Sequence, residues 1–81
     1  MEPILGQVQL FAFGFAPLGW MTCNGQLMPI PENTVLFSLL GTTYGGDGHT
    51  TFALPNIPPV TPQGPGYCIA IIGIAPTRPA P

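Results

Sequence analysis

Two stretches of the chain alternate between two sets of side chains, and both predict β-strands. In the first, residues 4–13, one set lies at even positions and the other at odd ones: Val8, Leu10 and Ala12 against Gln7, Gln9 and Phe11. This period of two is typical of a sheet with two different faces. The second stretch, residues 67–74, is apolar on both faces, so we expect both faces to be covered. In so small a chain, a neighbouring subunit is expected to supply the second cover.

A hairpin and a short helix are predicted between these strands. Residues 20–28 read as a hairpin whose tight turn is Asn24-Gly25. Residues 32–40 carry an apolar stripe at helical spacing, with the acidic Glu32 at the start and Gly41 as the cap. The expected fold class is therefore α+β: a small mostly-β domain with a hairpin, one short helix and a long C-terminal strand.

The rest of the chain is rich in glycine and proline. A polar loop follows the helix and is shaped by Gly45, Gly46, Asp47 and Gly48. A connector rich in proline and glycine covers residues 55–66, and a proline-rich arm covers residues 75–81. Neither segment suits a helix or a central strand. We expect one domain over residues 1–81.

Charge is unusually scarce. Only 5% of the residues are charged, 46% are hydrophobic and the net charge is −2, whereas a soluble domain has about 25% charged residues. A free monomer needs charge to stay apart from its copies, so we expect copies of this chain to cover one another. The predicted subunit contacts lie on the last strand and the arm: Tyr67, Ile69, Ile71, Ile74, Pro76 and Pro79.

The composition also narrows the classes of partner. No basic patch is present to bind nucleic acid, and no apolar run reaches the roughly 20 residues of a membrane span. No signal peptide is visible at the acidic N-terminus. The expected partners are therefore copies of the same chain, with a surface glycan or receptor as a further candidate.

Few side chains of the kinds that act in catalysis are present, and we predict that the protein is not an enzyme. Asp47 and His49 could be metal ligands or an acid–base pair, but Asp47 is better explained as a cap of the glycine loop. A zinc site usually needs four ligands, and the glycine loop lacks the lysine of a phosphate-binding loop. No catalytic, cofactor or metal residues are predicted. A sugar- or peptide-binding role stays open for Phe13, Phe15 and Tyr44.

The two cysteines, Cys23 and Cys68, admit two interpretations. They could form a disulfide, which is favoured if the protein works outside the cell. They could instead be buried thiols that act as small apolar side chains.

Several motifs resemble one known family in the same order along the chain. They are residues 6–12 and 15–20, residues 23–30, the run from Leu36 to Asn56 with its Phe52-Ala53-Leu54-Pro55 anchor, and Tyr67 to Ala70 with Gly73, Ile74 and Pro76. Together they resemble the phage tail collar domain, also found in microcystin-dependent proteins. The basic segment and variable insert of longer members are replaced here by residues 56–66, and His49 stands where the family usually has arginine.

The resemblance implies a structural role in a phage-tail-like particle. Together with the scarcity of charge, it favours a self-assembling subunit of an extracellular or phage-tail-like fibre or filament. The alternative is a fibre-tip module that recognises a cell-surface glycan or receptor. Either role implies an extracellular or virion location.

Overall fold

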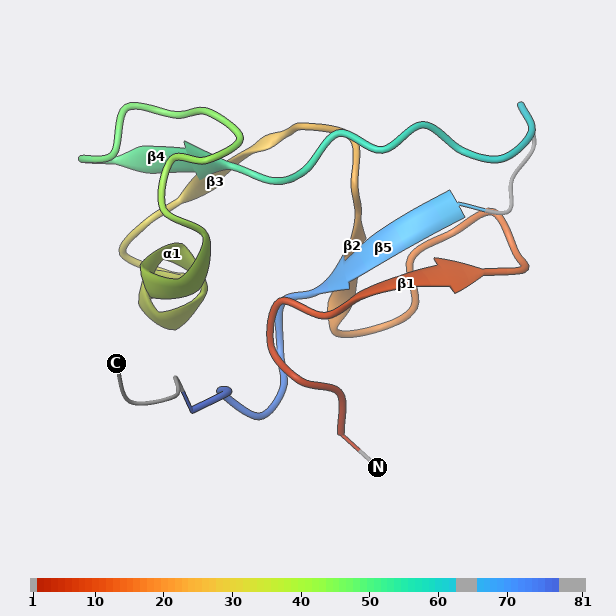
Figure 1. Ribbon diagram of the computed structural model, residues 1–81, viewed down its shortest axis with the longest axis horizontal. Helices are drawn as coiled ribbons and strands as arrows, with labels where there is room; N and C mark the ends of the chain where they lie inside the picture. Colours follow the sequence, from red (N-terminus) through yellow and green to blue (C-terminus); the bar gives the residue numbers. More distant parts are fainter. Residues whose placement is uncertain (1, 63–65, 78–81) are drawn as a thin grey trace.

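A computed structural model describes residues 2–62 and 66–77 (Figure 1). It consists of short strands in two antiparallel sheets and one short helix. In chain order the elements are β1 (Val8–Phe11), β2 (Trp20–Thr22), β3 (Leu27–Pro29), α1 (Thr34–Leu40), β4 (Thr51–Ala53) and β5 (Gly66–Ala70). The predicted class, a small mostly-β α+β fold, is confirmed.

The larger sheet has the order β1-β5-β2, so the last strand lies between the first two. β5 pairs antiparallel with both neighbours, with Ile69 opposite Val8 on one side and Met21 on the other. β5 is shorter than the predicted strand 67–74. Beyond Ala70 the chain turns to meet the N-terminus, where Ile74 donates its N–H to Pro3 at 2.9 Å and accepts one from Leu5 at 2.9 Å.

The predicted hairpin over residues 20–28 is wrong. β2 joins the larger sheet through β5, whereas β3 pairs with β4 in a separate two-stranded sheet. At the predicted Asn24-Gly25 turn, Gly25 has the expected positive φ, 78°. The turn does not, however, join two strands that pair with each other. There the chain passes between the sheets and is held by the connector, since the Gly25 N–H donates to the Pro55 carbonyl at 3.1 Å.

The helix begins at Thr34, two residues after the predicted start, and ends where expected. Gly41 takes a positive φ of 58°, and its N–H donates to the Phe37 carbonyl at 2.7 Å. Leu36 is the helical residue that is buried, at 2% exposure, while Val35 beside it is 49% exposed.

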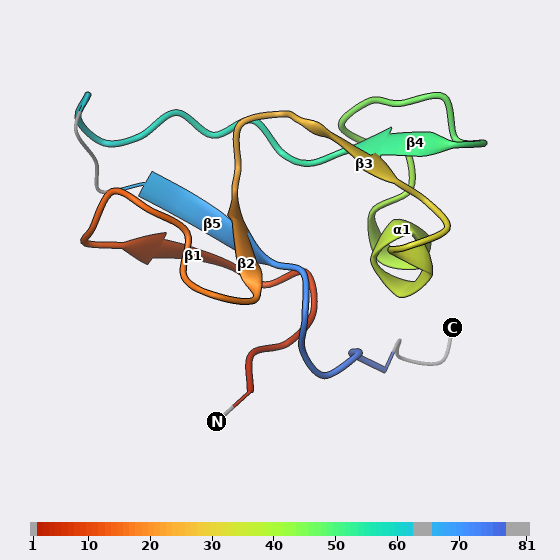
Figure 2. The same cartoon turned by 180° about the vertical axis from the view of Figure 1, so that it is seen from behind.

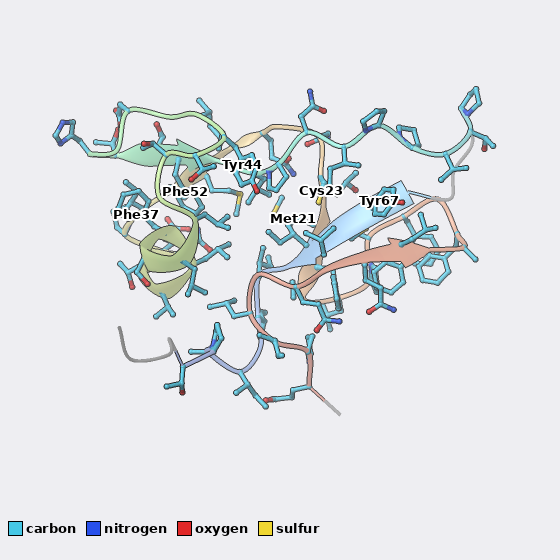
Figure 3. The ribbon with its side chains drawn as sticks, viewed as in Figure 1. Met21, Cys23, Phe37, Tyr44, Phe52 and Tyr67 are labelled. Atoms are coloured by element: carbon cyan, nitrogen blue, oxygen red, sulfur yellow. The ribbon has the colours of Figure 1, made fainter. Side chains whose placement is uncertain are left out.

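The core lies between α1 and the two sheets. Figures 1 and 2 show α1 below the two-stranded sheet, with the larger sheet to one side of both. The largest fully buried side chains come from every part of this arrangement: Phe52, Leu36, Leu54, Ile69 and Cys23. In Figure 3, Met21 of β2 and Cys23, which follows β2, lie on the side of the larger sheet that faces Phe52 of β4.

Candidate functional site

The pairing register gives the larger sheet two distinct faces. Side chains alternate across a strand, so Ile69 shares one face with its partners Val8 and Met21. We call this the core face, because Ile69 and Cys23 belong to the buried cluster. Cys68 lies on the opposite side, the outer face, with its partner Thr22.

An aromatic cluster covers the outer face. The Phe11 ring meets Trp20 edge-on at 4.9 Å and stacks on Phe13 at 5.3 Å, and Phe13 stacks on Phe15 at 4.6 Å. The loop after β1 therefore folds back across the sheet and helps to leave Cys68 at 4% and Ala70 at 0% exposure. The two faces of β5 are thus covered from within the subunit, whereas the sequence predicted that a neighbour would supply one cover.

The burial of β5 removes one of the predicted subunit contacts. Ile69 has no exposed surface, so it is a core residue and cannot contact another subunit. Tyr67 and Ile71 are partly buried against the core, while Ile74 and Pro76 are exposed. These four stay predictions, and Pro79 lies outside the described residues.

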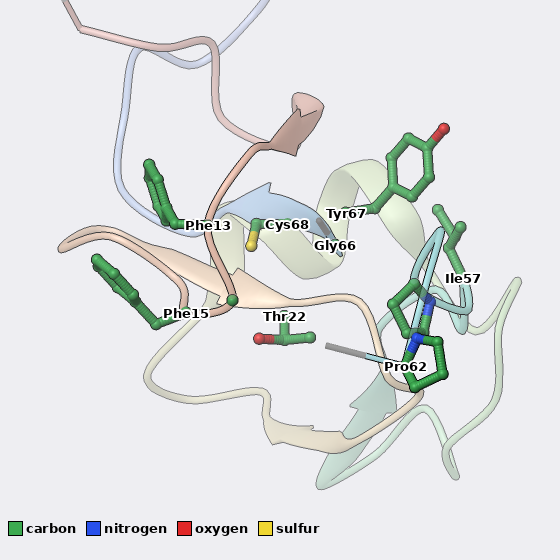
Figure 4. A pocket seen from close by; sticks show the side chains of 10 residues that line it. Phe13, Phe15, Thr22, Ile57, Pro62, Gly66, Tyr67 and Cys68 are labelled. Atoms are coloured by element: carbon green, nitrogen blue, oxygen red, sulfur yellow. The ribbon is translucent and has the colours of Figure 1, made fainter. Parts of the chain in front are cut away.

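A cavity of about 220 Å³ opens beside the aromatic cluster (Figure 4). Its walls come from the loop after β1, from β2, from the connector and from β5: Phe13, Gly14, Phe15, Thr22, Ile57, Pro59, Pro62, Gly66, Tyr67 and Cys68. Phe15 is 66% exposed, and no charged side chain is among these residues. The cavity therefore suits a neutral ligand that stacks on aromatic rings. Tyr44, the third open aromatic residue, does not line it.

The connector's contribution to this cavity was missed from sequence. Ile57, Pro59 and Pro62 reach it only because the chain returns along the sheet after β4. Proline-rich segments are often extended docking arms as well as linkers, and the sequence does not say onto what they fold.

The glycine loop is held by Asp47, as predicted for a cap. One carboxylate oxygen, Oδ1, accepts the backbone N–H groups of His49, Thr50 and Thr51 at 2.8–2.9 Å. The other, Oδ2, accepts the Thr50 hydroxyl at 2.8 Å. These hydrogen bonds stabilise the charged carboxylate and hold the pKa of Asp47 well below its usual range. The hydrogen bond from the Thr51 N–H contributes most. Asp47 thus has a structural role that accounts for both of its oxygens.

Asp47 should make the stability of the loop depend on pH. Its pKa is lower in the folded than in the unfolded chain, so its contribution is present above the ordinary Asp value of about 3.9 and is lost as the pH falls toward the folded pKa. We expect Asp47→Asn to lower the urea midpoint at pH 7 and to reduce its fall between about pH 5 and pH 2.

Urea titrations followed by circular dichroism at a series of pH values would measure this effect. Glu32→Gln removes one negative charge at another exposed carboxylate and controls for the change in net charge. An Asp47→Asn variant with the wild-type midpoint at pH 7 would contradict the assigned role.

The two cysteines are buried free thiols, so the predicted disulfide is not formed in this structure. The reason is geometric. Cys68 pairs with Thr22, and Cys23 follows Thr22 directly, so the side chains of Cys23 and Cys68 leave the sheet on opposite faces. A disulfide needs Cβ atoms about 3.5–4.5 Å apart and directed at one another.

Burial should make both thiols unreactive. It raises the pKa of Cys23 to about 11, with the nearby Cys68 adding to the effect, and it also raises the pKa of Cys68. A pKa of about 11 in place of 9.0 lowers the thiolate fraction at pH 8 about a hundredfold. We expect a disulfide reagent such as Ellman's to titrate the thiols rapidly only after unfolding in urea. A thiol that reacts rapidly in the native protein would contradict this burial.

The outward edge of β1 has unpaired backbone groups. Ala70 donates its N–H to the Gln7 carbonyl at 2.9 Å, which fixes the alternation in this antiparallel pair. The N–H and C=O groups of Gln9 then point toward β5, and those of Val8 and Leu10 point away from it. Within the described residues, these outward groups have no strand beside them. This edge was not predicted from sequence, although the run from Gln7 to Ala12 carries neither charge nor proline.

The opposite edge, at β2, is partly occupied by local hydrogen bonds. The Trp20 N–H donates to the Pro17 carbonyl at 3.0 Å. The Thr22 carbonyl accepts the Asn24 N–H at 3.0 Å and the Gln26 side-chain amide at 2.9 Å. Among the described residues, β1 is therefore the edge of this sheet with more outward backbone groups left for another strand.

No group of three or more potential metal-ligating side chains occurs among residues 2–62 and 66–77. No helix in that part of the chain is long and apolar enough to cross a membrane.

The fold and its surfaces define a small α+β domain built from two sheets, a glycine loop and an aromatic-lined cavity. The chain belongs to the Phage Tail Collar Domain family, whose family model matches residues 6–62, well over half of its length. The family resemblance seen in the sequence is thereby confirmed. No curated protein and no solved structure matches the chain. Membership in this family of structural phage-tail domains implies a structural role in a phage tail fibre and a location at the virion tail.

Proposed function

We propose that this protein is a structural subunit that associates with further copies of itself in an extracellular or phage-tail-like fibre or filament. The observation that carries the proposal is the amount of apolar surface left open. The exposed side chains include Ile4, Val8, Leu10, Phe13, Phe15, Leu18, Leu27, Val35, Tyr44, Val60, Ile72 and Ile74.

These side chains would be costly to leave in water. Covering apolar surface contributes about 25 cal/mol per Å², and large exposed apolar patches usually mark interaction sites. Leu18 is fully exposed, and Phe15 and Ile72 are about two-thirds exposed. Because only 5% of the residues are charged, little electrostatic repulsion opposes contact between copies.

Sedimentation velocity over a range of protein concentrations, with negative-stain electron microscopy of the same samples, would test this function. We expect oligomers or filaments that grow with concentration and are strengthened by sulfate, which favours apolar burial. A monodisperse monomer at every concentration would overturn the proposal.

The cavity supports a second function, a fibre-tip module that recognises a surface glycan or receptor. Its support is the stacked pair Phe13 and Phe15, which line a neutral cavity and offer ring faces of the kind that sugars stack on. A glycan array would test it with Phe15→Ala as the disrupting variant and Tyr44→Ala, outside the cavity, as the control. Binding that survives Phe15→Ala, or no binding at all, would reject this function.

A further inference from the structure

We propose that two copies of this chain join through their β1 edges, antiparallel and around a two-fold axis at Gln9. The proposal rests on the proposed self-association and names the contact that begins it. The outward backbone groups of Val8 and Leu10 define a short edge that is complementary to itself.

The hydrogen-bond pattern selects the register. In an antiparallel pair, residues that exchange backbone hydrogen bonds lie opposite one another. Placing Val8 opposite Leu10 of a second copy brings together all the outward N–H and C=O groups of both residues. Gln9, whose backbone groups point toward β5, then faces Gln9 of the second copy as a non-hydrogen-bonded pair.

The side chains suit the same register. Val8 and Leu10 lie on the core face and are 40% and 42% exposed, so the pairing would place each beside the other and extend the apolar face across two subunits. Gln9 lies on the outer face, where its side-chain oxygen accepts the Gln7 amide at 3.2 Å. The Gln9 amide nitrogen can donate across the axis, since a glutamine side chain both donates and accepts.

The lack of charge along the β1 edge favours a second copy of the chain as the strand that pairs with it. Strand edges are commonly protected from pairing by lysine, proline or bulges, and β1 contains neither lysine nor proline. A charged edge would repel its own copy directly opposite, whereas this edge is neutral throughout. Because a two-fold contact closes on itself, it would form a dimeric building block, and a fibre would need a second contact.

Disulfide trapping would test the register. Directly opposite residues in a non-hydrogen-bonded pair have Cα atoms about 4.5 Å apart, within the range that a disulfide spans. We expect Gln9→Cys to give a covalent dimer under mild oxidation. Cys23 and Cys68 are buried and should not contribute.

Gln7→Cys is the matched control. It places the same thiol on the same face, but the proposed register sets Gln7 opposite Phe11 of the second copy. Two Gln7 positions then lie about 13 Å apart along the strands, beyond disulfide reach. We expect little or no covalent dimer from this variant, and equal trapping of the two variants would overturn the register.

A charge exchange supplies an independent measurement. Gln9→Lys and Gln9→Glu each put like charges across the axis, so each homodimer should bind roughly fivefold or more weakly than wild type. An equimolar mixture of the two variants should recover the affinity. Thr42→Lys, in the loop after α1, controls for added charge.

The results of these experiments distinguish a failure of the β1 contact from a failure of the proposed self-association. If wild type associates but Gln9→Cys fails to cross-link and the charge variants bind as wild type does, copies meet elsewhere and the β1 contact is rejected. If wild type stays monomeric throughout, the proposed self-association fails and the contact fails with it. Selective trapping at Gln9 with recovery in the mixture would support the contact.

Discussion

Replacing Gly46 with alanine is expected to destabilise the fold more than any other alanine substitution of a glycine in the glycine loop. Gly46 has a φ of 93°, and a Cβ atom placed there would lie 2.4 Å from the Cα of Phe52 and 2.7 Å from the carbonyl oxygen of Thr51. Both contacts are with backbone, which cannot rotate away. Backbone strain of about 1–3 kcal/mol and overpacking of about 1–3 kcal/mol together predict a loss of roughly 2–6 kcal/mol.

Two further glycines separate strain from steric clash. Gly41 has a φ of 58° and a ψ of −146°, a conformation that other residues avoid, but a Cβ atom added there would meet no atom of the described residues within 4 Å. Gly41→Ala should therefore show strain alone, about 1–3 kcal/mol. Gly66 has no positive φ in the strained range, and a Cβ atom added there would meet no atom of the described residues within 4 Å, so Gly66→Ala should be neutral within about 0.5 kcal/mol. Urea unfolding followed by circular dichroism would measure the series. A Gly46→Ala variant as stable as Gly66→Ala would contradict the close backbone approach.

Truncating Phe52 is expected to have an effect of similar size through the core. The Phe52 ring has no exposed surface and lies 5.5 Å from the Phe37 ring of α1, centroid to centroid. Phe52→Ala would remove the largest fully buried side chain and leave a cavity between the helix and the two-stranded sheet. Such changes typically lose about 3–5 kcal/mol, which would unfold much of so small a domain.

The same substitution at an exposed phenylalanine is the control. Phe15 is 66% exposed, so Phe15→Ala should change the free energy of unfolding by less than about 1 kcal/mol. Phe52→Leu, which keeps more of the volume, should remain folded and lose an intermediate amount. Chemical unfolding of all three variants provides the measurement. Equal losses at Phe52 and Phe15 would show that Phe52 is not the centre of the core.

Local patterns in the sequence were sufficient where the structure depends on neighbours along the chain. The helix from Thr34 to Leu40 ends at Gly41 because a cap is made by groups within one turn. Asp47 holds the glycine loop because its carboxylate reaches N–H groups two to four residues ahead. The strand-forming character of residues near Val8 and Cys68 was likewise visible in their alternation.

Predictions that depended on distant partners were less successful. The Asn24-Gly25 turn favoured a local hairpin, but β2 gained a central partner in β5 that lies far away in the sequence. Cys23 and Cys68 were candidates for a bridge until the register placed them on opposite faces of one sheet. Ile69 was predicted to be a contact residue because both faces of its strand are apolar, and the sequence does not reveal which face turns to the core. The loop from Phe11 to Phe15 covers the other face.

The residues alone were enough to predict the class of the fold, the family, the helix and the glycine loop, because short-range hydrogen bonds and backbone angles are encoded in adjacent residues. Only the folded chain shows which strand lies in the centre, which face is covered and which edge stays open. Those outcomes depend on the alignment of β1, β2 and β5 from opposite ends of the chain, and a period-two pattern gives the faces of a strand without naming its neighbours.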